Sequence, residues 1–398
     1  MAQPPLDLAS RSFSLIQTGD RDTNEDEFFA NNQHIEATNS GDDGGTGLIF
    51  ACIDGDANRV RVLLSQGART DQTDAKGVPP LFFAAREGHL EVCKDLVASG
   101  AVVNGESNNG FSPWLEACAK GHLHIVEYFV EIGQHIEEAD SNGYTALIIA
   151  SAFGKANIVH FLLSKGACVG WTNAYGLPPL FFAAKEGHLE VCRELVEMGA
   201  DVNQQSDNSS PWLEACKKGH LPIVEFFVDN GQQNIEATDS DGDTGLTIAA
   251  FIGNAEIVRF LLSKNARFVR TIDEGFSPLF LAARKGHLEV CKALVAKGAS
   301  FNGESNNGFS PWLEACARGN LPIVKFFMAN GQDIEFTYSD DGATGLMYAS
   351  REGKANVVRF LLSQGARTDR TDAKGFTALN EAFENGHEEI VVIFLCMH

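Results

Sequence analysis

The chain has 398 residues, a formal net charge of −22 and 44% hydrophobic residues. Such an acidic chain lacks the basic footprint that nucleic-acid phosphates require, so we expect no nucleic acid among its partners. Residues Met1 to Pro5 lack the basic and apolar regions of a signal peptide, and no apolar run approaches the ~20 residues of a membrane span. The composition therefore also argues against membrane insertion.

The nine cysteines form an odd set without paired spacing, which favours a reducing compartment, the cytoplasm or also the nucleus. Seven of them recur at two positions of a repeated pattern, and we expect them to be small buried side chains. They are Cys52, Cys118, Cys216 and Cys316 at one position, and Cys93, Cys192 and Cys291 at the other.

An internal repeat organises the chain. The segment 79–93 returns almost unchanged at 178–192 and with small edits at 277–291, and a second segment, 104–119, reappears at 302–317 and in edited form at 203–217. The period is about 99 residues, divided into units of about 33. Because so short a unit can bury its apolar face only against its neighbours, the chain is predicted to be a stacked array.

Within one unit, the predicted elements follow a fixed order. A hydroxyl residue such as Thr46, or Ser112 followed by Pro113, begins a first helix. A large apolar residue lies near its start, and a glycine seven positions later ends it in a left-handed turn. A second amphipathic helix follows and closes at a Gly-Ala pair, and an exposed loop rich in Asp, Asn and Gly completes the unit.

These units resemble ankyrin repeats. The family pattern is matched by Gly77, Pro80-Leu81, Ala84-Ala85, Gly88-His89, Val92, Leu96 and Gly100-Ala101. The resemblance implies an all-α solenoid of stacked helix-turn-helix pairs with protruding β-turn finger loops. We expect about eleven repeats in one domain over residues 44–398, preceded by an N-terminal segment, 1–43, with a degenerate capping repeat.

One position departs from the family pattern. The histidine that usually follows the core leucine is replaced by residues such as Phe82, Ile148 and Thr247. We therefore expect apolar packing in place of the hydrogen bond that this histidine makes in the family.

Several residue sets suggest metal binding or catalysis, but each has a simpler interpretation. Six histidines share one slot in successive units, which places them too far apart to share an ion at ~2 Å, so they are interpreted as structural Gly-His turns. The acidic segment 239–243 resembles a calcium loop, but its glycine comes too early and its twelfth position is Ala250 rather than Glu. The tryptophans Trp114, Trp212 and Trp312 occupy the slot of the core leucine and are predicted to pack there. The histidines are His89, His122, His188, His220, His287 and His387.

The sequence pairs no nucleophile with an oriented base and contains no glycine-rich phosphate loop. We therefore predict a non-enzymatic protein with no catalytic residue, no metal and no cofactor.

With catalysis set aside, we expect the surface of the stacked repeats to bind another protein. In ankyrin repeats, the ends of the first helices and the finger loops line a groove, where basic and apolar side chains of this chain form a candidate partner-binding set. Leucine is common in the family at the positions of Phe83, Phe182 and Leu281, so these three are equally compatible with packing. The predicted set is Phe153, Phe182, Lys185, Lys217, Lys218, Phe251, Ile252, Arg284, Lys285, Arg318 and Arg351.

The predicted function is a protein–protein interaction scaffold that holds a segment of another protein along this groove. An acidic and apolar peptide would suit the groove, and a basic segment would suit the acidic fingers. The alternative is a regulatory adaptor or inhibitor that recruits or sequesters an enzyme, as part of a larger chain.

Two further expectations concern the state of the chain. We expect a monomer unless something covers the apolar C-terminal helix, which contains Ile390, Val391, Ile393, Phe394 and Leu395. Asn203, with Asp201 and Leu195 before it, resembles the sites at which asparaginyl hydroxylases modify ankyrin repeats. A role of Asn203 in the hydrogen bonds of its own loop is the favoured interpretation.

Overall fold

The structure is a computed structural model that describes residues 44–105, 107, 110–206, 209–231, 234–268, 276–303, 309–337 and 341–396. The degenerate repeat predicted within residues 1–43 lies outside these residues. Contacts divide the chain into two compact units, Met1–Asp207 and Asn208–His398. We keep the word unit for these two parts and call each segment of about 33 residues a repeat.

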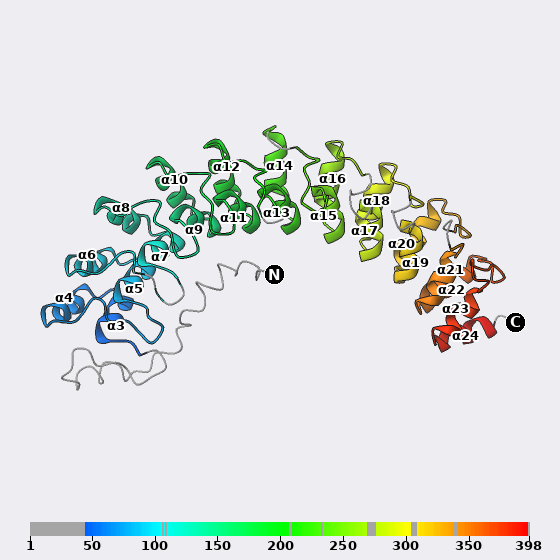
Figure 1. Cartoon of the computed structure of the whole chain (residues 1–398), viewed down its shortest axis with the longest axis horizontal. Helices are drawn as coiled ribbons and strands as arrows, with labels where there is room; N and C mark the ends of the chain where they lie inside the picture. Colours follow the sequence, from blue (N-terminus) through cyan, green and yellow to red (C-terminus); the bar gives the residue numbers. More distant parts are fainter. Residues whose placement is uncertain are drawn as a thin grey trace. The chain divides into compact units, whose positions relative to one another are not determined.

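The first unit contains five helix pairs in its described part (Figure 1). They are α3 (Gly47–Asp54) with α4 (Ala57–Ser65), α5 (Pro80–Glu87) with α6 (Leu90–Ala98), α7 (Pro113–Lys120) with α8 (Leu123–Glu131), α9 (Ala146–Ala152) with α10 (Ala156–Ser164), and α11 (Pro179–Glu186) with α12 (Leu189–Glu197).

The second unit contains six helix pairs in its described part. They are α13 (Pro211–Lys218) with α14 (Leu221–Asp229), α15 (Gly245–Ile252) with α16 (Ala255–Ser263), α17 (Pro278–Lys285) with α18 (Leu288–Ala296), α19 (Pro311–Arg318) with α20 (Leu321–Ala329), α21 (Gly345–Arg351) with α22 (Ala355–Ser363), and α23 (Ala378–Glu384) with α24 (Glu388–Leu395).

Each unit has two helical layers. Every odd-numbered helix contacts the next odd-numbered helix of its unit, and the even-numbered helices contact one another in the same way. We call these the inner and outer layers. Isolated antiparallel bridges, such as that between Ala139 and Thr145, are the β pairing in the described residues. The predicted all-α architecture of stacked helix pairs is confirmed.

The helix ends follow the predicted signals. The Ser112 hydroxyl accepts a hydrogen bond from the Leu115 N–H at 3.3 Å, and Pro113 follows in the first turn. Gly121 then ends α7 with a φ of 86°. Where a helix ends one residue earlier, as α9 does at Ala152 with Phe153 as its C-cap, the glycine that follows the cap, Gly154, still has a positive φ of 66°.

The core consists of residues that recur in register. Trp114, Trp212 and Trp312 are fully buried in the leucine slot, as predicted, and the last member of that row, Leu379, is only half-buried. All seven repeat cysteines predicted to be buried are buried free thiols.

The Gly-His turns have a structural role that the sequence interpretation did not specify. His287 Nε2 lies 3.0 Å from the Phe251 carbonyl oxygen, and His89, His122, His188 and His387 make the same bond to the preceding inner helix of their unit. Since a carbonyl oxygen only accepts, Nε2 carries the proton. Asn320 replaces the histidine in one repeat and donates to the Ala283 carbonyl at 2.6 Å.

The hydrogen bond of His287 also explains why residue 253 is a glycine. Gly253 has a φ of 95°, and a Cβ atom there would lie 2.5 Å from the imidazole Nδ1 of His287. The glycine that follows the first helix of each repeat, which we call the landmark glycine, therefore provides both a left-handed turn and room for the histidine of the next repeat.

The position after the core leucine, where this chain lacks the histidine of the family pattern, is filled by apolar packing in most repeats, as expected. Phe82 and Ile148 are fully buried there. Two repeats instead restore a polar contact: the Thr247 and Thr244 hydroxyls lie 2.9 Å apart, and the Thr377 N–H donates to Asn380 Oδ1 at 3.0 Å. The expectation of apolar packing was therefore wrong for these two repeats, because a short polar side chain at this position reaches the helix cap.

Candidate functional site

The candidate site is the surface formed by the last turns of the inner helices, which we call the inner-helix surface of each unit. In the first unit it includes three residues of the predicted set. Phe153 is half-buried, and Lys185 is half-buried with its ammonium 3.6 Å from the Glu186 carboxylate. Phe182 is buried, and its ring centroid lies 5.7 Å from that of Tyr144.

The alternative that Phe83, Phe182 and Leu281 pack in the core is confirmed, because all three are buried. The apolar part of the candidate site lies instead on α15. Phe251 and Ile252 are 44% and 43% exposed. In the described part of the chain, α15 and α23 are the inner helices with exposed large hydrophobic side chains.

Cations surround this apolar pair within the second unit. The exposed Lys285 on α17 places its ammonium nitrogen 4.4 Å from the centroid of the Phe251 ring, which is a cation–π distance. Lys218 is exposed at the end of α13, the inner helix that contacts α15 on its other side.

Several of the predicted basic residues are paired with glutamates of the inner helices. Arg284 and Arg318 lie 3.4 and 2.9 Å from the same oxygen of Glu314. The hydrogen bond and charge of Glu314 raise the pKa of Arg318. Lys217 lies 3.6 Å from Glu214. These three cations are therefore partly neutralised within the protein.

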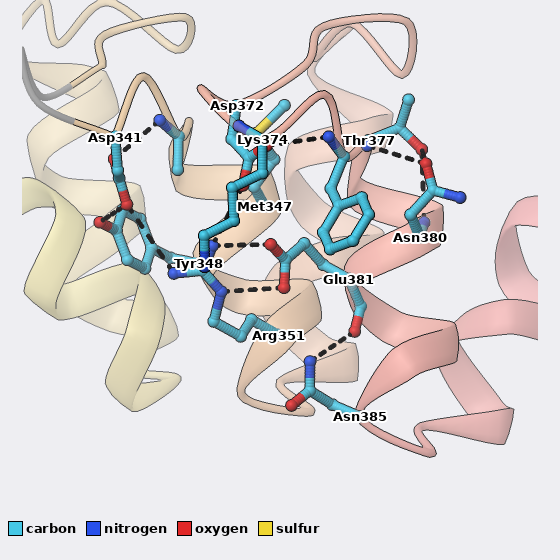
Figure 2. Close-up of polar contacts among 12 residues, drawn as sticks. Asp341, Met347, Tyr348, Arg351, Asp372, Lys374, Thr377, Asn380, Glu381 and Asn385 are labelled. Carbon is cyan, nitrogen blue, oxygen red and sulfur yellow. Dashed lines mark hydrogen bonds and ion pairs between the residues drawn. The ribbon is translucent and has the colours of Figure 1, made fainter.

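Arg351 is the most extensively paired of the set. It donates to both carboxylate oxygens of Glu381, lies 3.6 Å from Asp372 and 3.8 Å from Asp341, and stacks 5.1 Å from the Tyr348 ring centroid (Figure 2). The hydrogen bond to Glu381 raises the pKa of Arg351 above its ordinary value. Burial and a hydrogen bond to Asp341 raise the pKa of Tyr348.

A repeated pair geometry was missed by the sequence reasoning. Arg86 with Glu116, Arg284 with Glu314, and Arg351 with Glu381 join adjacent inner helices, each at a separation of 30 residues. The signal was present in the sequence, because the repeat register fixes which arginine faces which glutamate.

Glu116 differs from the other glutamates at this position. Its side chain is buried, and neither carboxylate oxygen has a hydrogen-bond partner. Arg86 and Lys120 lie 3.9 and 3.7 Å away and lower its pKa, but burial outweighs them and raises the pKa of Glu116.

The chemistry of the buried thiols does not suit catalysis. Burial raises the pKa of the Cys93 and Cys291 thiols to about 12, so they are protonated at neutral pH and poor nucleophiles. Across the residues that the structure describes, no cluster of three or more His, Cys, Asp or Glu side chains could hold a metal ion. No helix within them combines the length and apolarity needed to cross a membrane.

The remaining predicted features are placed as follows. The backbone N–H of Asn203 donates to Asp201 Oδ1 at 2.8 Å, and the role of the Asn203 side chain stays a prediction. On α24, Ile390 and Phe394 are buried, Val391 and Ile393 are half-buried and Leu395 is 62% exposed.

The comparison with family models decides the family. The model described as ankyrin repeats (3 copies) matches residues 23–107, 96–173, 114–206, 168–239, 212–305 and 312–398. The chain belongs to the ankyrin-repeat family. The eleven described helix pairs are eleven ankyrin repeats.

Similar proteins share only parts of this ankyrin-repeat chain. It is 32% identical over 72 residues to E3 ubiquitin-protein ligase KEG of Arabidopsis thaliana, which covers 18% of this chain and 4% of that protein. It is 40% identical over 57 residues to protein fem-1 homolog A-like of Mus musculus, covering 14% and 9%. The chain therefore matches less than a tenth of the length of either relative.

A solved structure supports the fold. The human ASB11 ankyrin repeat domain matches with a TM-score of 0.52 and 22% identity, over 56% of this chain and 99% of that domain. At this identity the similarity concerns the fold.

Proposed function

We propose that this ankyrin-repeat chain is a non-enzymatic scaffold that binds a segment of a partner protein on its inner-helix surface. The observation that carries the proposal is the exposed pair Phe251 and Ile252, in a row of helix ends whose other members are mostly polar or small. An exposed apolar cluster with a charged rim is typical of a binding surface.

The test is affinity capture with the full chain, followed by identification of cross-linked partners. The Lys217→Glu/Phe251→Asp variant should lose the partners that the native chain captures. A control with the same change in net charge, Lys292→Glu/Val62→Asp, alters exposed positions of outer helices and should retain them. Capture that is equal for the native chain and both variants would refute the assignment of the surface.

A second candidate is an adaptor that recruits or sequesters an enzyme. The partial similarity to a plant E3 ubiquitin-protein ligase favours it. In that case, captured material should contain ubiquitin-ligase activity that depends on the native inner-helix surface. Partners without any associated enzyme would favour the plain scaffold.

We also propose that residues 44–398 form one repeat domain and that the chain is monomeric unless something covers its apolar C-terminal helix. The in-phase repeat supports the first statement, and the burial of Ile390 and Phe394 supports the second, whereas the exposed Val392 and Leu395 are the side chains that a covering partner would contact. Limited proteolysis should leave one resistant fragment, and sedimentation should give the mass of a single chain. Two stable fragments or a dimer mass would contradict these proposals.

For the compartment, we propose the cytoplasm, with the nucleus also compatible. Seven buried free thiols support a reducing environment. Imaging of the tagged chain tests this, and a secreted product would contradict it.

A further inference from the structure

The inner-helix surface of the second unit contains one patch in which apolar exposure and free positive charge coincide. Phe251 and Ile252 end α15, Lys218 ends α13 and Lys285 ends α17. Both α13 and α17 contact α15, so the two lysines flank the apolar pair. We call these four residues the Phe251 patch.

The two lysines differ from the basic residues around them. Lys217, Arg284 and Arg318 each have a glutamate oxygen within 3.6 Å. Lys218 and Lys285 form no ion pair with any described residue, and both are exposed. Their charges are therefore available to a ligand.

Lys285 is also positioned by its contact with Phe251. With the ammonium 4.4 Å from the ring centroid, the charge lies beside the apolar surface rather than extending into solvent. The Phe251 carbonyl is in turn held by His287 at 3.0 Å. A partner would thus meet a partly preorganised combination of ring and charge, which lowers the entropic cost of binding.

We infer that the Phe251 patch binds a partner segment in which an apolar side chain is flanked on both sides by Asp or Glu. This inference rests on the proposed function and names the chemistry of its partner. The apolar side chain covers Phe251 and Ile252, and the flanking carboxylates pair with Lys218 and Lys285. A partner with basic flanks would place like charges together.

The helix spacing sets the distance between the two acidic residues. Packed helices lie about 8–10 Å apart, so the ends of α13 and α17, which carry Lys218 and Lys285, are separated by about two such steps, roughly 20 Å. Lys285 leans over Phe251, which shortens the distance towards one step. An extended segment rises about 3.3 Å per residue, so the carboxylates should be about three to six residues apart.

Nucleic acid and anionic membranes are less suitable ligands for this patch. The patch offers two cations without an ion pair among the described residues, since Lys217, Arg284 and Arg318 beside it pair with Glu214 and Glu314, and the whole chain has a net charge of −22. A phosphate backbone or lipid surface presents many negative charges to such a surface, and the net field repels them. A short segment needs to match only the patch.

The experiment selects displayed random twelve-residue peptides on the full-length chain and then measures affinities of synthetic selected peptides by fluorescence anisotropy. We expect enrichment of an apolar residue between two acidic residues at the stated spacing. Lys218→Glu/Lys285→Glu and Phe251→Asp should each bind these peptides at least about tenfold more weakly. Versions of the peptides with Lys in place of the acids should prefer Lys218→Glu/Lys285→Glu over the native chain.

A control variant, Lys264→Glu/Lys292→Glu, changes the net charge equally at lysines of the outer helices and should bind like the native chain. Circular dichroism of every variant must match the native spectrum. Should Phe251→Asp unfold the repeat, the lysine variant and its charge-reversed peptides still decide the question.

Three results would overturn the inference: the selection enriches basic or uncharged peptides, it enriches none, or the selected peptides bind the native chain and Lys218→Glu/Lys285→Glu with equal affinity. Patch-dependent binding of phosphatidylserine vesicles or single-stranded DNA without peptide enrichment would overturn it as well. If the native chain still captures partner proteins in those cases, the proposed scaffold function survives without this patch. If it captures none, both fail.

Discussion

Arg351 donates from Nε and Nη2 to the two carboxylate oxygens of Glu381, at 2.9 and 2.6 Å, and so ties α21 to α23 (Figure 2). Glu381 is buried, and the pair lies across the boundary between two repeats. Because stability in a repeat array depends on interfaces between neighbours, this ion pair fastens the last repeat to the one before it.

Replacing Arg351 with Met should therefore destabilise the last repeats. It leaves the buried Glu381 without its bidentate partner, and we expect a loss of about 2 kcal/mol, since part of the Arg351 side chain is exposed to water. Urea unfolding measures the loss, and hydrogen exchange should localise it to α23 and α24.

Arg367 provides a matched control. It makes the same bidentate contact with Asp369, at 3.0 and 2.8 Å, but both side chains are more than half exposed. Arg367→Met should leave the unfolding midpoint unchanged. Equal effects of the two substitutions would show that burial of Glu381 does not determine the strength of the Arg351 pair.

Glu116→Gln should stabilise the chain at neutral pH. The pKa of Glu116 is raised from its ordinary 4.5 by burial, so the folded state binds a proton more tightly than the unfolded state. The stability of the native chain relative to Glu116→Gln is therefore highest below pH 4.5 and falls as pH rises through the raised pKa. Above it, we expect the variant to be more stable by about 1 kcal/mol.

Unfolding midpoints measured from pH 4 to 8 check this result. Glu314→Gln is the comparison at the equivalent position, where the carboxylate accepts the Arg318 Nε–H at 2.9 Å. Weakening this hydrogen bond in Glu314→Gln should lower the free energy of unfolding by about 1–2 kcal/mol at pH 7, whereas Glu116→Gln should raise it. A pH-independent difference between the native chain and Glu116→Gln would contradict the assignment of a buried, titrating carboxyl.

His287→Ala should cost about 1 kcal/mol, because it removes the donor to the Phe251 carbonyl. His287→Asn should restore most of that loss, since Asn320 donates to a carbonyl of the preceding inner helix from the same repeat position. His160→Ala is the control: it removes a contact with Glu194 at 2.7 Å from a side chain that is 78% exposed, and such a surface pair should contribute little. Equal unfolding temperatures of His287→Ala and His287→Asn would show that the hydrogen bond to the Phe251 carbonyl does not stabilise the fold.

Gly253→Ala tests the second role of the landmark glycine. Alanine there must adopt a φ of 95° and place its Cβ 2.5 Å from the His287 ring, and we expect a loss of about 3 kcal/mol. Gly298→Ala has a similar φ of 92° but nothing within 4 Å of the added Cβ, so it should cost about 1 kcal/mol. Equal losses in urea unfolding would mean that only the backbone conformation matters.

For the candidate site, the sequence predicted some exposures correctly and others not. Phe251 and Ile252 were correctly predicted to be exposed, although Ala119 and Ala317, at the position of Phe251 in their repeats, are buried. Phe182 belongs to the predicted set but is buried against Tyr144. Its position one turn earlier in the helix faces the adjacent repeat, and sequence alone did not reveal how closely that repeat approaches.

The amino-acid sequence alone determined the number and order of the helix pairs, their caps and their core rows. These features depend on local signals, such as Ser112 before Pro113 or a glycine with positive φ, and on apolar spacing within about 33 residues. Tertiary structure decided which charges remain free. Arg284 and Lys285 are neighbours in the chain, yet one pairs with Glu314 and the other leans over Phe251, because side chains leaving a helix at successive positions point in directions about 100° apart and meet different repeats.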